Sequence, residues 1–384
     1  MALSYKFRGS FANLWMPVTE EFLETLRKAY PTIFDVFETF NFETIRQKIT
    51  TKVNAWCAPV LPDGRRGCLS NRGRRPEDVL LMFKICLIQR LLGCSDAEME
   101  CRMNTDLSLR YLLDFDPNSA IYKAPSQKTI WKYRDIFIQS GVFEEFNLDT
   151  MAAIAAQPLV ESDDARVIDS SFVEAPIQRN TREENQAIKD GDGDKLWLDQ
   201  PRKKCQKDID ARWTQKGGKR FFGYKLHIKI SAATKLILSA IITAANVHDS
   251  QVIAPLLNAT DAWKTLYADS GYRGQEQEAI VRFFGMTPCF CERAYRGHPL
   301  SAEQKNENTK KSSVRSRIEH TFGFIENSMG GSTVRSIGMK RAVGLQHLTV
   351  LAYNLHRLSQ LVRGKAIVPV TLRLNEAQQD LSPG

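Results

Sequence analysis

The stretch ARVIDSSFVEA, residues 165–175, decides the fold, because the spacing of apolar residues changes there. Before it, apolar residues recur every three or four positions, which is typical of amphipathic helices, whereas here the period becomes two. The segments FFGYKLHIKIS (221–231) and LILSAIITAANV (236–247) are also strand-like and are joined by the turn AATK. The sequence therefore predicts a helical region followed, near residue 160, by a new domain that begins with strands.

After residue 247, the predicted elements alternate between helix and strand. The patterns predict helices at 248–260, 274–285 and 312–329, and strands at 265–269 and 286–292. Strands followed by alternating strands and helices indicate a mixed α/β sheet covered by helices.

Asp169 lies inside the first predicted strand, where a charged side chain is unusual. Val167 and Ile168 precede it, and Phe172 and Val173 follow it. An isolated buried carboxylate would cost several kcal/mol or take up a proton. We therefore expect a nearby group to compensate the charge of Asp169.

Asp269 ends the apolar run of LYADSGYRG (266–274) and has two interpretations. Asp and Ser at a strand end often accept hydrogen bonds from their own backbone and open a turn, which Gly271 would ease. Alternatively, sheets of this type commonly place the strand at 265–269 beside the first one, which makes Asp169 and Asp269 neighbours. Two adjacent anions repel each other unless a cation lies between them, and Mg²⁺ prefers such oxygen ligands.

Glu319 is the third candidate carboxylate and lies on the predicted helix 312–329. Arg315, Glu319, Gly323 and Glu326 share one face of this helix. Arg315 and Glu319 are four residues apart, so they also fit a surface ion pair, which contributes only ~0.3 to 0.5 kcal/mol. Gly323 costs about 1 kcal/mol relative to Ala in a helix and leaves a bare patch that suits the approach of a ligand.

The first 150 residues predict short helices joined by tight turns. Amphipathic helices are expected between residues 17 and 50, a helix from near Pro76 to Gly93, and capped helix starts at Ser95 and Ser126. The pattern fits a helix-turn-helix DNA-binding domain and equally a plain helical bundle. The basic residues expected at the surface of this region are Lys128, Lys132 and Arg134, with Arg74 and Arg75 in the arginine-rich loop 63–75.

Composition favours a polyanionic partner. The 384 residues include 53 Lys and Arg against 44 Asp and Glu, which gives a net charge of +9. The eight cysteines form no CxxC pair, as is typical of reduced thiols in cytosolic proteins. Cys289, Cys291 and His298 do not have the spacing of a usual zinc site, so core packing is preferred. The sequence has no apolar signal core and no membrane-spanning run, and a cytoplasmic location is expected.

Several motifs, in order, resemble those of a known family, the DDE transposases of bacterial insertion sequences, and within it the IS-five branch. The stretch 74–137 resembles the amino-terminal domain of that family, and LTVLAYNLHRL resembles its closing helix. The resemblance covers roughly residues 70–360. The motifs that resemble the catalytic domain are DSSFVEAP, FFGYKLHI, TAANVHDS, ADSGYRG and RSRIEHTFGF.

The resemblance implies an α/β fold, namely an RNase H-like mixed sheet flanked by helices and preceded by an all-helical DNA-binding region. It implies that Asp169, Asp269 and Glu319 hold two Mg²⁺ ions, for which Mn²⁺ can substitute. The family helix usually reads Y-x-x-R-x-x-x-E, with Lys or Arg seven residues after the Glu. Here Ser312 and Glu326 stand at the tyrosine and basic positions, so the departure concerns the DNA contacts of that face.

Four residues near the carboxylates are expected to contact DNA. Arg315 is expected to hold a phosphate or to orient Glu319. Lys225 lies on the same strand face as His227, and each reaches DNA or lines the sheet. The remaining expected contacts are Tyr272 and Arg273, directly after the second aspartate.

Two further stretches have open interpretations. Trp197 and Trp213, in the charged insertion 178–220, fit either stacking on a distorted base or a small core of the insertion. In NVHDSQ (246–251), Asp249 or Ser250 is expected to cap the next helix.

The leading hypothesis is a Mg²⁺-dependent transposase that binds the terminal inverted repeats of an insertion sequence, cleaves the ends and joins them to target DNA. Its expected partners are double-stranded DNA and a second or further copy of the chain, without a membrane, in the nucleoid of a bacterium. The alternatives are a host-adopted RNase H-like nuclease and a catalytically silent DNA-binding regulator. The expected segments are a helical segment 1–60, a DNA-binding domain 61–150, a catalytic domain 160–360 and a flexible tail 361–384.

Overall fold

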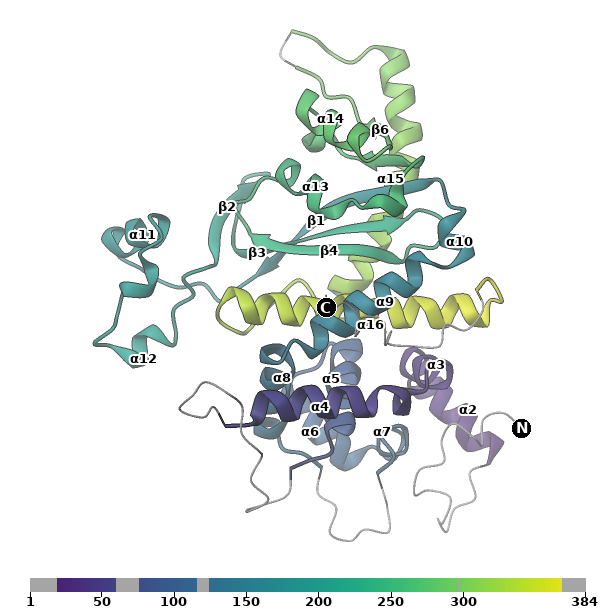
Figure 1. Cartoon of the computed structure of the whole chain (residues 1–384), viewed down its shortest axis with the longest axis vertical. Helices are drawn as coiled ribbons and strands as arrows, with labels where there is room; N and C mark the ends of the chain where they lie inside the picture. Colours follow the sequence, from purple (N-terminus) through teal and green to yellow (C-terminus); the bar gives the residue numbers. More distant parts are fainter. Residues whose placement is uncertain (1–18, 60–75, 116–123, 296, 368–384) are drawn as a thin grey trace, which may run out of the picture. The chain divides into compact units, whose positions relative to one another are not determined.

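Contacts in the computed structural model divide the chain into two units (Figure 1). The first unit comprises residues 1–153 and 351–384, and the second comprises residues 154–350. The structure describes residues 19–59, 76–115, 124–295 and 297–367.

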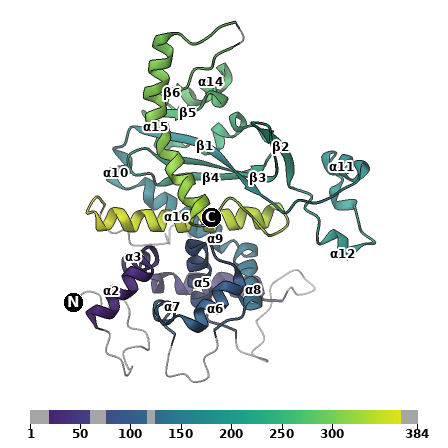
Figure 2. The same ribbon diagram turned by 180° about the vertical axis from the view of Figure 1, so that it is seen from behind.

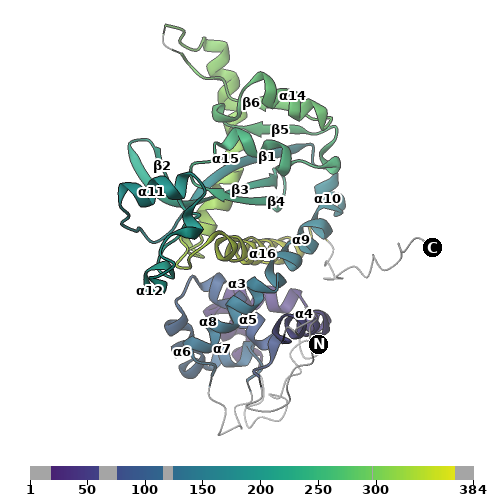
Figure 3. The ribbon, with the colours of Figure 1, turned by 60° about the vertical axis from the view of Figure 1, so that its left-hand side comes forward.

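The first unit is helical, as predicted (Figure 3). Its elements are α2 (Glu20–Ala29), α3 (Pro31–Thr39), η2 (Phe42–Ile45), α4 (Arg46–Cys57), α5 (Val79–Leu92), α6 (Asp96–Thr105), α7 (Leu107–Leu112) and α8 (Gln127–Gln139). The boundaries between the two units fall inside α9 (Val142–Ala155) and α16 (Met339–Arg363).

Side-chain caps set the helix boundaries in this unit. Ser95 and Ser126 accept hydrogen bonds from the backbone three residues later, which confirms the predicted starts of α6 and α8. Helix α5 ends at Gly93, whose φ of 61° suits glycine. It begins at Val79, three residues after Pro76, because Asp78 provides the cap.

Aromatic rings form the centre of the first unit. The ring of Phe83 on α5 lies 6.1 Å from that of Phe137, 6.0 Å from that of Phe143 and 5.6 Å from that of Phe146. Aromatic residues bury large apolar areas, so these contacts hold α5, α8 and α9 together.

The second unit is built on a six-stranded mixed sheet, which confirms the predicted RNase H-like fold class. Strand β1 pairs with β3 antiparallel and with β5 parallel, β3 also pairs with β2 and β4, and β5 pairs parallel with β6. The strands are β1 (Ala165–Glu174), β2 (Arg212–Lys216), β3 (Lys219–Ser231), β4 (Ile237–Ala244), β5 (Thr265–Ala268) and β6 (Thr287–Phe290).

Short helices and one long helix complete this unit. They are α10 (Pro158–Glu161), α11 (Arg182–Lys189), η3 (Gly193–Lys195), α12 (Pro201–Lys204), η4 (Asp249–Val252), α13 (Ile253–Leu256), η5 (Ala259–Asp261), η6 (Ser270–Tyr272), α14 (Gln275–Phe283) and α15 (Ala302–Asn327).

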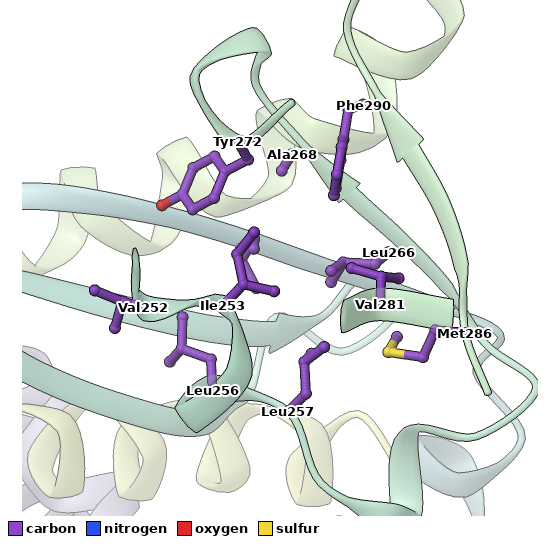
Figure 4. Close-up of a cluster of buried hydrophobic side chains, with 11 residues drawn as sticks. Val252, Ile253, Leu256, Leu257, Leu266, Ala268, Tyr272, Val281, Met286 and Phe290 are labelled. Atoms are coloured by element: carbon purple, nitrogen blue, oxygen red, sulfur yellow. The ribbon is translucent and has the colours of Figure 1, made fainter. Parts of the chain in front are cut away.

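The two faces of the sheet differ. Ile168 of β1 belongs to an apolar cluster on the face that packs on α13 and α14. Figure 4 shows Leu266 of β5 in the same cluster. Asp169 is next to Ile168 in the strand, so its side chain points to the opposite face. Helix α15 crosses that opposite face, as the reverse view shows (Figure 2).

The insertion between β1 and β2 contains α11, η3 and α12 (Figure 1). Trp197 is buried there, and its indole N–H donates to Glu184 Oε1 over 2.7 Å. This contact supports the small-core interpretation for Trp197.

No helix within the described part of the chain is long and apolar enough to cross a membrane.

Candidate active site

Asp169 is a half-enclosed carboxylate at the centre of β1. Its side chain is 17% exposed, its Oδ1 accepts the Ser170 backbone N–H over 2.8 Å, and its Oδ2 accepts from Arg315 Nη1 over 3.1 Å. Burial, together with the charge of Asp269, raises the pKa of Asp169 to about 6, although the Ser170 N–H and Arg315 oppose the shift. Arg315 is therefore the group that compensates the charge of Asp169, as the sequence led us to expect.

Asp269 is the neighbour of Asp169 in the sheet. Arg166 pairs with Leu266 and Val167 with Tyr267, and the same register continued by two residues brings Asp169 opposite Asp269. The side chain of Asp269 accepts the Gly271 backbone N–H over 2.8 Å and caps η6. The turn-opening interpretation is confirmed, and it leaves Oδ2 of Asp269 without a hydrogen bond from any described residue.

Helix α15 brings Arg315 and Glu319 to the same face. Arg315 Nη2 lies 3.3 Å from Glu319 Oε1, so the ion pair expected from their spacing is present. Arg315 also bonds to Asp169, and its own Nε is buried without a hydrogen-bond partner among the described residues. The side chain of Glu319 is 60% exposed. One guanidinium thus connects two of the three candidate carboxylates.

The donor chemistry of the two aspartates fits a divalent metal ion. Both offer hard carboxylate oxygens, and their repulsion favours a cation between them. Across residues 19–59, 76–115, 124–295 and 297–367, however, no three His, Cys, Asp or Glu side chains are close enough to hold an ion. Among these described residues, Glu319 thus does not form one such group with Asp169 and Asp269, and it bonds to Arg315 instead.

Glu326 forms a contact that sequence reasoning missed. Its Oε1 accepts from the Ser171 hydroxyl over 2.5 Å, which ties α15 to β1 on the same face as Asp169. Ser171 lies two residues after Asp169 and therefore on the same face of β1. This alternation is the feature of the sequence that could have predicted a contact with the helix on that face. At the position where the related helices have a basic residue, the chain thus has a helix-to-strand contact.

Polar side chains of β3 form a cluster on the face of the sheet opposite Asp169. Lys225 Nζ donates to Asp249 Oδ1 over 2.9 Å, and its side chain is largely buried, so the expectation that Lys225 contacts DNA conflicts with the structure. His227 is fully buried and bonds to Thr243 Oγ1 over 2.9 Å, and burial lowers its pKa to about 4. His227 lines the sheet.

The cap of η4 differs from the expectation. The side chain of His248 accepts the Ser250 backbone N–H over 3.3 Å. Asp249 was an expected cap, but it bonds to Lys225 instead.

Three other expected DNA contacts are already engaged. Tyr272 has no exposed surface and packs in the apolar cluster, so a contact with the cleaved strand conflicts with its burial (Figure 4). Arg273 forms an ion pair with Glu292. Arg134 bonds to Asp96 through both terminal nitrogens, over 2.5 and 2.8 Å, because it faces the gap between α6 and α8 and not solvent. The expected solvent exposure of Arg134 is therefore wrong.

Lys128 and Lys132 are exposed on α8, in keeping with the prediction. Arg74 and Arg75 lie outside the described residues.

Trp213 differs from Trp197. It is 46% exposed, its ring packs on Phe222 at 5.1 Å, and it borders a pocket of about 440 Å³ with Thr214, Gln215 and Arg220. The small-core interpretation does not extend to Trp213.

Comparison with known proteins identified two matching family models. One, described as a transposase DDE domain, matches residues 161–355, and the other, described as a transposase domain (DUF772), matches residues 36–135. A solved structure, the cryo-EM structure of the piggyBac transposase synaptic complex with hairpin DNA, is similar over 86% of this chain and 76% of that chain, with 9% identity and a TM-score of 0.42.

Proposed function

The chain belongs to the transposases that carry a DDE domain, and from this membership we propose that it binds the terminal inverted repeats of an insertion sequence, cleaves the ends and joins them to target DNA. We assign it to the IS-five branch of that family on its sequence motifs. Because joining requires two ends together, the proposed active form on DNA is at least a dimer.

We propose Asp169, Asp269 and Glu319 as the catalytic carboxylates. The observation that supports this proposal is the parallel register of β1 and β5, which, continued by two residues, puts Asp169 opposite Asp269, beside strands on which α15 packs. The ion that these oxygens would hold is Mg²⁺, with Mn²⁺ as a substitute. Two such ions would activate the attacking oxygen and stabilise the leaving oxygen at the phosphate.

Backbone hydrogen bonds to both aspartates support this proposal. Oδ1 of Asp169 accepts the Ser170 N–H and Oδ1 of Asp269 accepts the Gly271 N–H, so one oxygen of each carboxylate is fixed. Such outer contacts hold a ligating carboxylate in one rotamer. Oδ2 of each carboxylate then remains to bind a cation, whether guanidinium or metal ion.

We propose that DNA contacts lie on exposed basic residues. Lys128 and Lys132 support this for the helical unit because both side chains are exposed on one helix. Arg74 and Arg75 remain proposed from their sequence alone. Lys225, Tyr272 and Arg134 are left out of the proposal because of their burial or ion pairs. Arg273 and Arg315 could contact a phosphate only after exchanging their carboxylate partners.

The test is incubation of the purified protein with Mg²⁺, labelled element ends and a target plasmid. Joined products are expected and support the transposase function. Cut ends without joining would replace it by a nuclease function, and bound but uncut ends by a regulatory function.

A further inference from the structure

Arg315 holds together two carboxylates that we propose as metal ligands. Its Nη1 bonds to Asp169 Oδ2 over 3.1 Å and its Nη2 to Glu319 Oε1 over 3.3 Å. Its side chain is 23% exposed, and its Nε has no partner among the described residues. The guanidinium therefore reaches from α15 to β1 and uses the same oxygens that a metal ion would need.

The charges around Arg315 explain why it lies there. Asp169 and Asp269 are neighbouring acids, and without a cation only the backbone N–H groups of Ser170 and Gly271 offset their repulsion. Arginine keeps its charge at all ordinary pH values, and its fork matches two carboxylates at once. Arg315 thus supplies the positive charge beside Asp169, and Glu319 bonds to the same guanidinium.

We propose that Arg315 is an internal counter-ion of the metal-free site, which must release Asp169 before a divalent ion binds there. The inference rests on the proposed function, because it takes Asp169, Asp269 and Glu319 as the ligands. It differs from the role of orienting Glu319, since it predicts competition between the guanidinium and the ion. Once released, Arg315 is free to bond to a phosphate.

Competition and orientation predict opposite effects of the substitution Arg315→Gln. If Arg315 competes, the variant binds Mn²⁺ about tenfold more tightly, because one nearby positive charge and two hydrogen bonds to the ligands are lost. Its metal-free form also unfolds at a lower temperature, because the repulsion between Asp169 and Asp269 is no longer offset. If Arg315 orients Glu319, the variant binds Mn²⁺ more weakly.

The experiment is calorimetric titration of the full-length protein with MnCl₂ in the absence of DNA, paired with thermal unfolding at each metal concentration. Arg317→Gln is the matched control, because Arg317 is exposed on the same helix and loses the same charge. We expect wild-type affinity from this control. Equal or weaker Mn²⁺ binding by Arg315→Gln than by the wild type overturns the inference.

Two further variants separate the possible failures. Arg315→Lys keeps the charge without the fork and provides the test if Arg315→Gln does not fold, with a smaller gain in affinity expected and no gain overturning the inference. Asp169→Asn reports whether Mn²⁺ binds at this site at all. Wild-type binding that survives Asp169→Asn contradicts the proposed metal site itself, whereas binding that is lost in Asp169→Asn but unchanged in Arg315→Gln contradicts only the counter-ion role.

Discussion

Asp169 shows how a single residue depends on its surroundings. It lies in a strand between apolar neighbours, and burial raises its pKa to about 6, so the fold disfavours its charge. The Ser170 N–H and Arg315 stabilise that charge, whereas the nearby Asp269 repels it. A perturbed acid beside a second acid and a cation is typical of a functional site.

We expect Asp169→Asn to reduce cleavage of element ends to background, because the amide cannot provide a charged ligand. Binding of the ends should not weaken, since Asp169 is distant in sequence from the proposed DNA-binding lysines of α8. Gel-based cleavage and fluorescence anisotropy on the same preparation measure both properties. Loss of cleavage together with loss of binding would indicate a structural role for Asp169.

His227 makes stability depend on pH. Burial lowers its pKa to about 4, below the value of ~6.5 for an exposed imidazole, so the folded state binds this proton less well than the unfolded state. The contribution of the neutral His227 ring to the free energy of unfolding is fully present above pH 6.5. It is lost as the pH falls towards 4, because the unfolded state then binds the proton more tightly. One pKa unit corresponds to about 1.4 kcal/mol, so the free energy of unfolding should fall by on the order of a few kcal/mol over this range.

The measurement for His227 is urea unfolding between pH 7 and pH 4.5. The wild type should lose more stability over this range than His227→Gln, whose amide can still bond to Thr243 but does not titrate. Parallel pH profiles for the two proteins would show that His227 is not the group responsible.

At the scale of elements, two glycines have opposite roles. Gly223 lies where β3 meets β1, with a φ of 147°, and a Cβ there would approach Val173 O to 2.3 Å. Gly323 lies within α15, and a Cβ there would meet no atom within 4 Å. The first glycine is required by a close backbone approach, whereas the second costs helix stability without a steric reason.

The same substitution should therefore have opposite effects at the two positions. Gly223→Ala is expected to lower the free energy of unfolding by roughly 2 kcal/mol or more, because the backbone of β1 or β3 must shift. Gly323→Ala is expected to raise it by about 1 kcal/mol. Chemical denaturation measures both, and a loss of stability in Gly323→Ala would show that a neighbour is crowded there.

The function of α15 can be examined with the same variant. If the bare patch at Gly323 admits DNA, Gly323→Ala should cut element ends more slowly despite its higher stability. Unchanged cleavage would mean that the glycine serves no ligand.

At the scale of the whole molecule, both units match transposase families, and the chain carries a net charge of +9. DNA binding by such a protein releases counter-ions, so its affinity should fall steeply as salt increases. Lys128→Gln should reduce the slope of log affinity against log salt by about 1. Fluorescence anisotropy at several salt concentrations measures this slope.

The control for Lys128 is Lys28→Gln, which removes the same charge from an exposed ion pair with Glu24 on α2. Its slope should equal that of the wild type. If both variants change the slope equally, the protein binds DNA through its net charge and not through α8.

The sequence by itself determined the fold class and most strands of this protein, but not every element. It missed β2 in the insertion, it expected one helix at 248–260 where η4, α13 and η5 lie, and it expected α15 to begin at 312 and not at Ala302. Helix starts at Ser95 and Ser126 and the strand at 165–175 depend on bonds and periods that span only a few residues, so they were predictable. The pairing of β1 with β5 followed from the order of the elements, and with it the adjacency of Asp169 and Asp269.

Only the tertiary structure decided which polar groups bond to one another. Lys225, Arg134 and Tyr272 were expected at a DNA surface, yet each is buried or paired with groups on another segment. Arg315 was expected either to hold a phosphate or to orient Glu319, and its contact with Asp169, which spans 146 positions of the chain, was not expected. Such contacts depend on how helices and strands pack, and a polar side chain takes whichever partner that packing brings within hydrogen-bond distance.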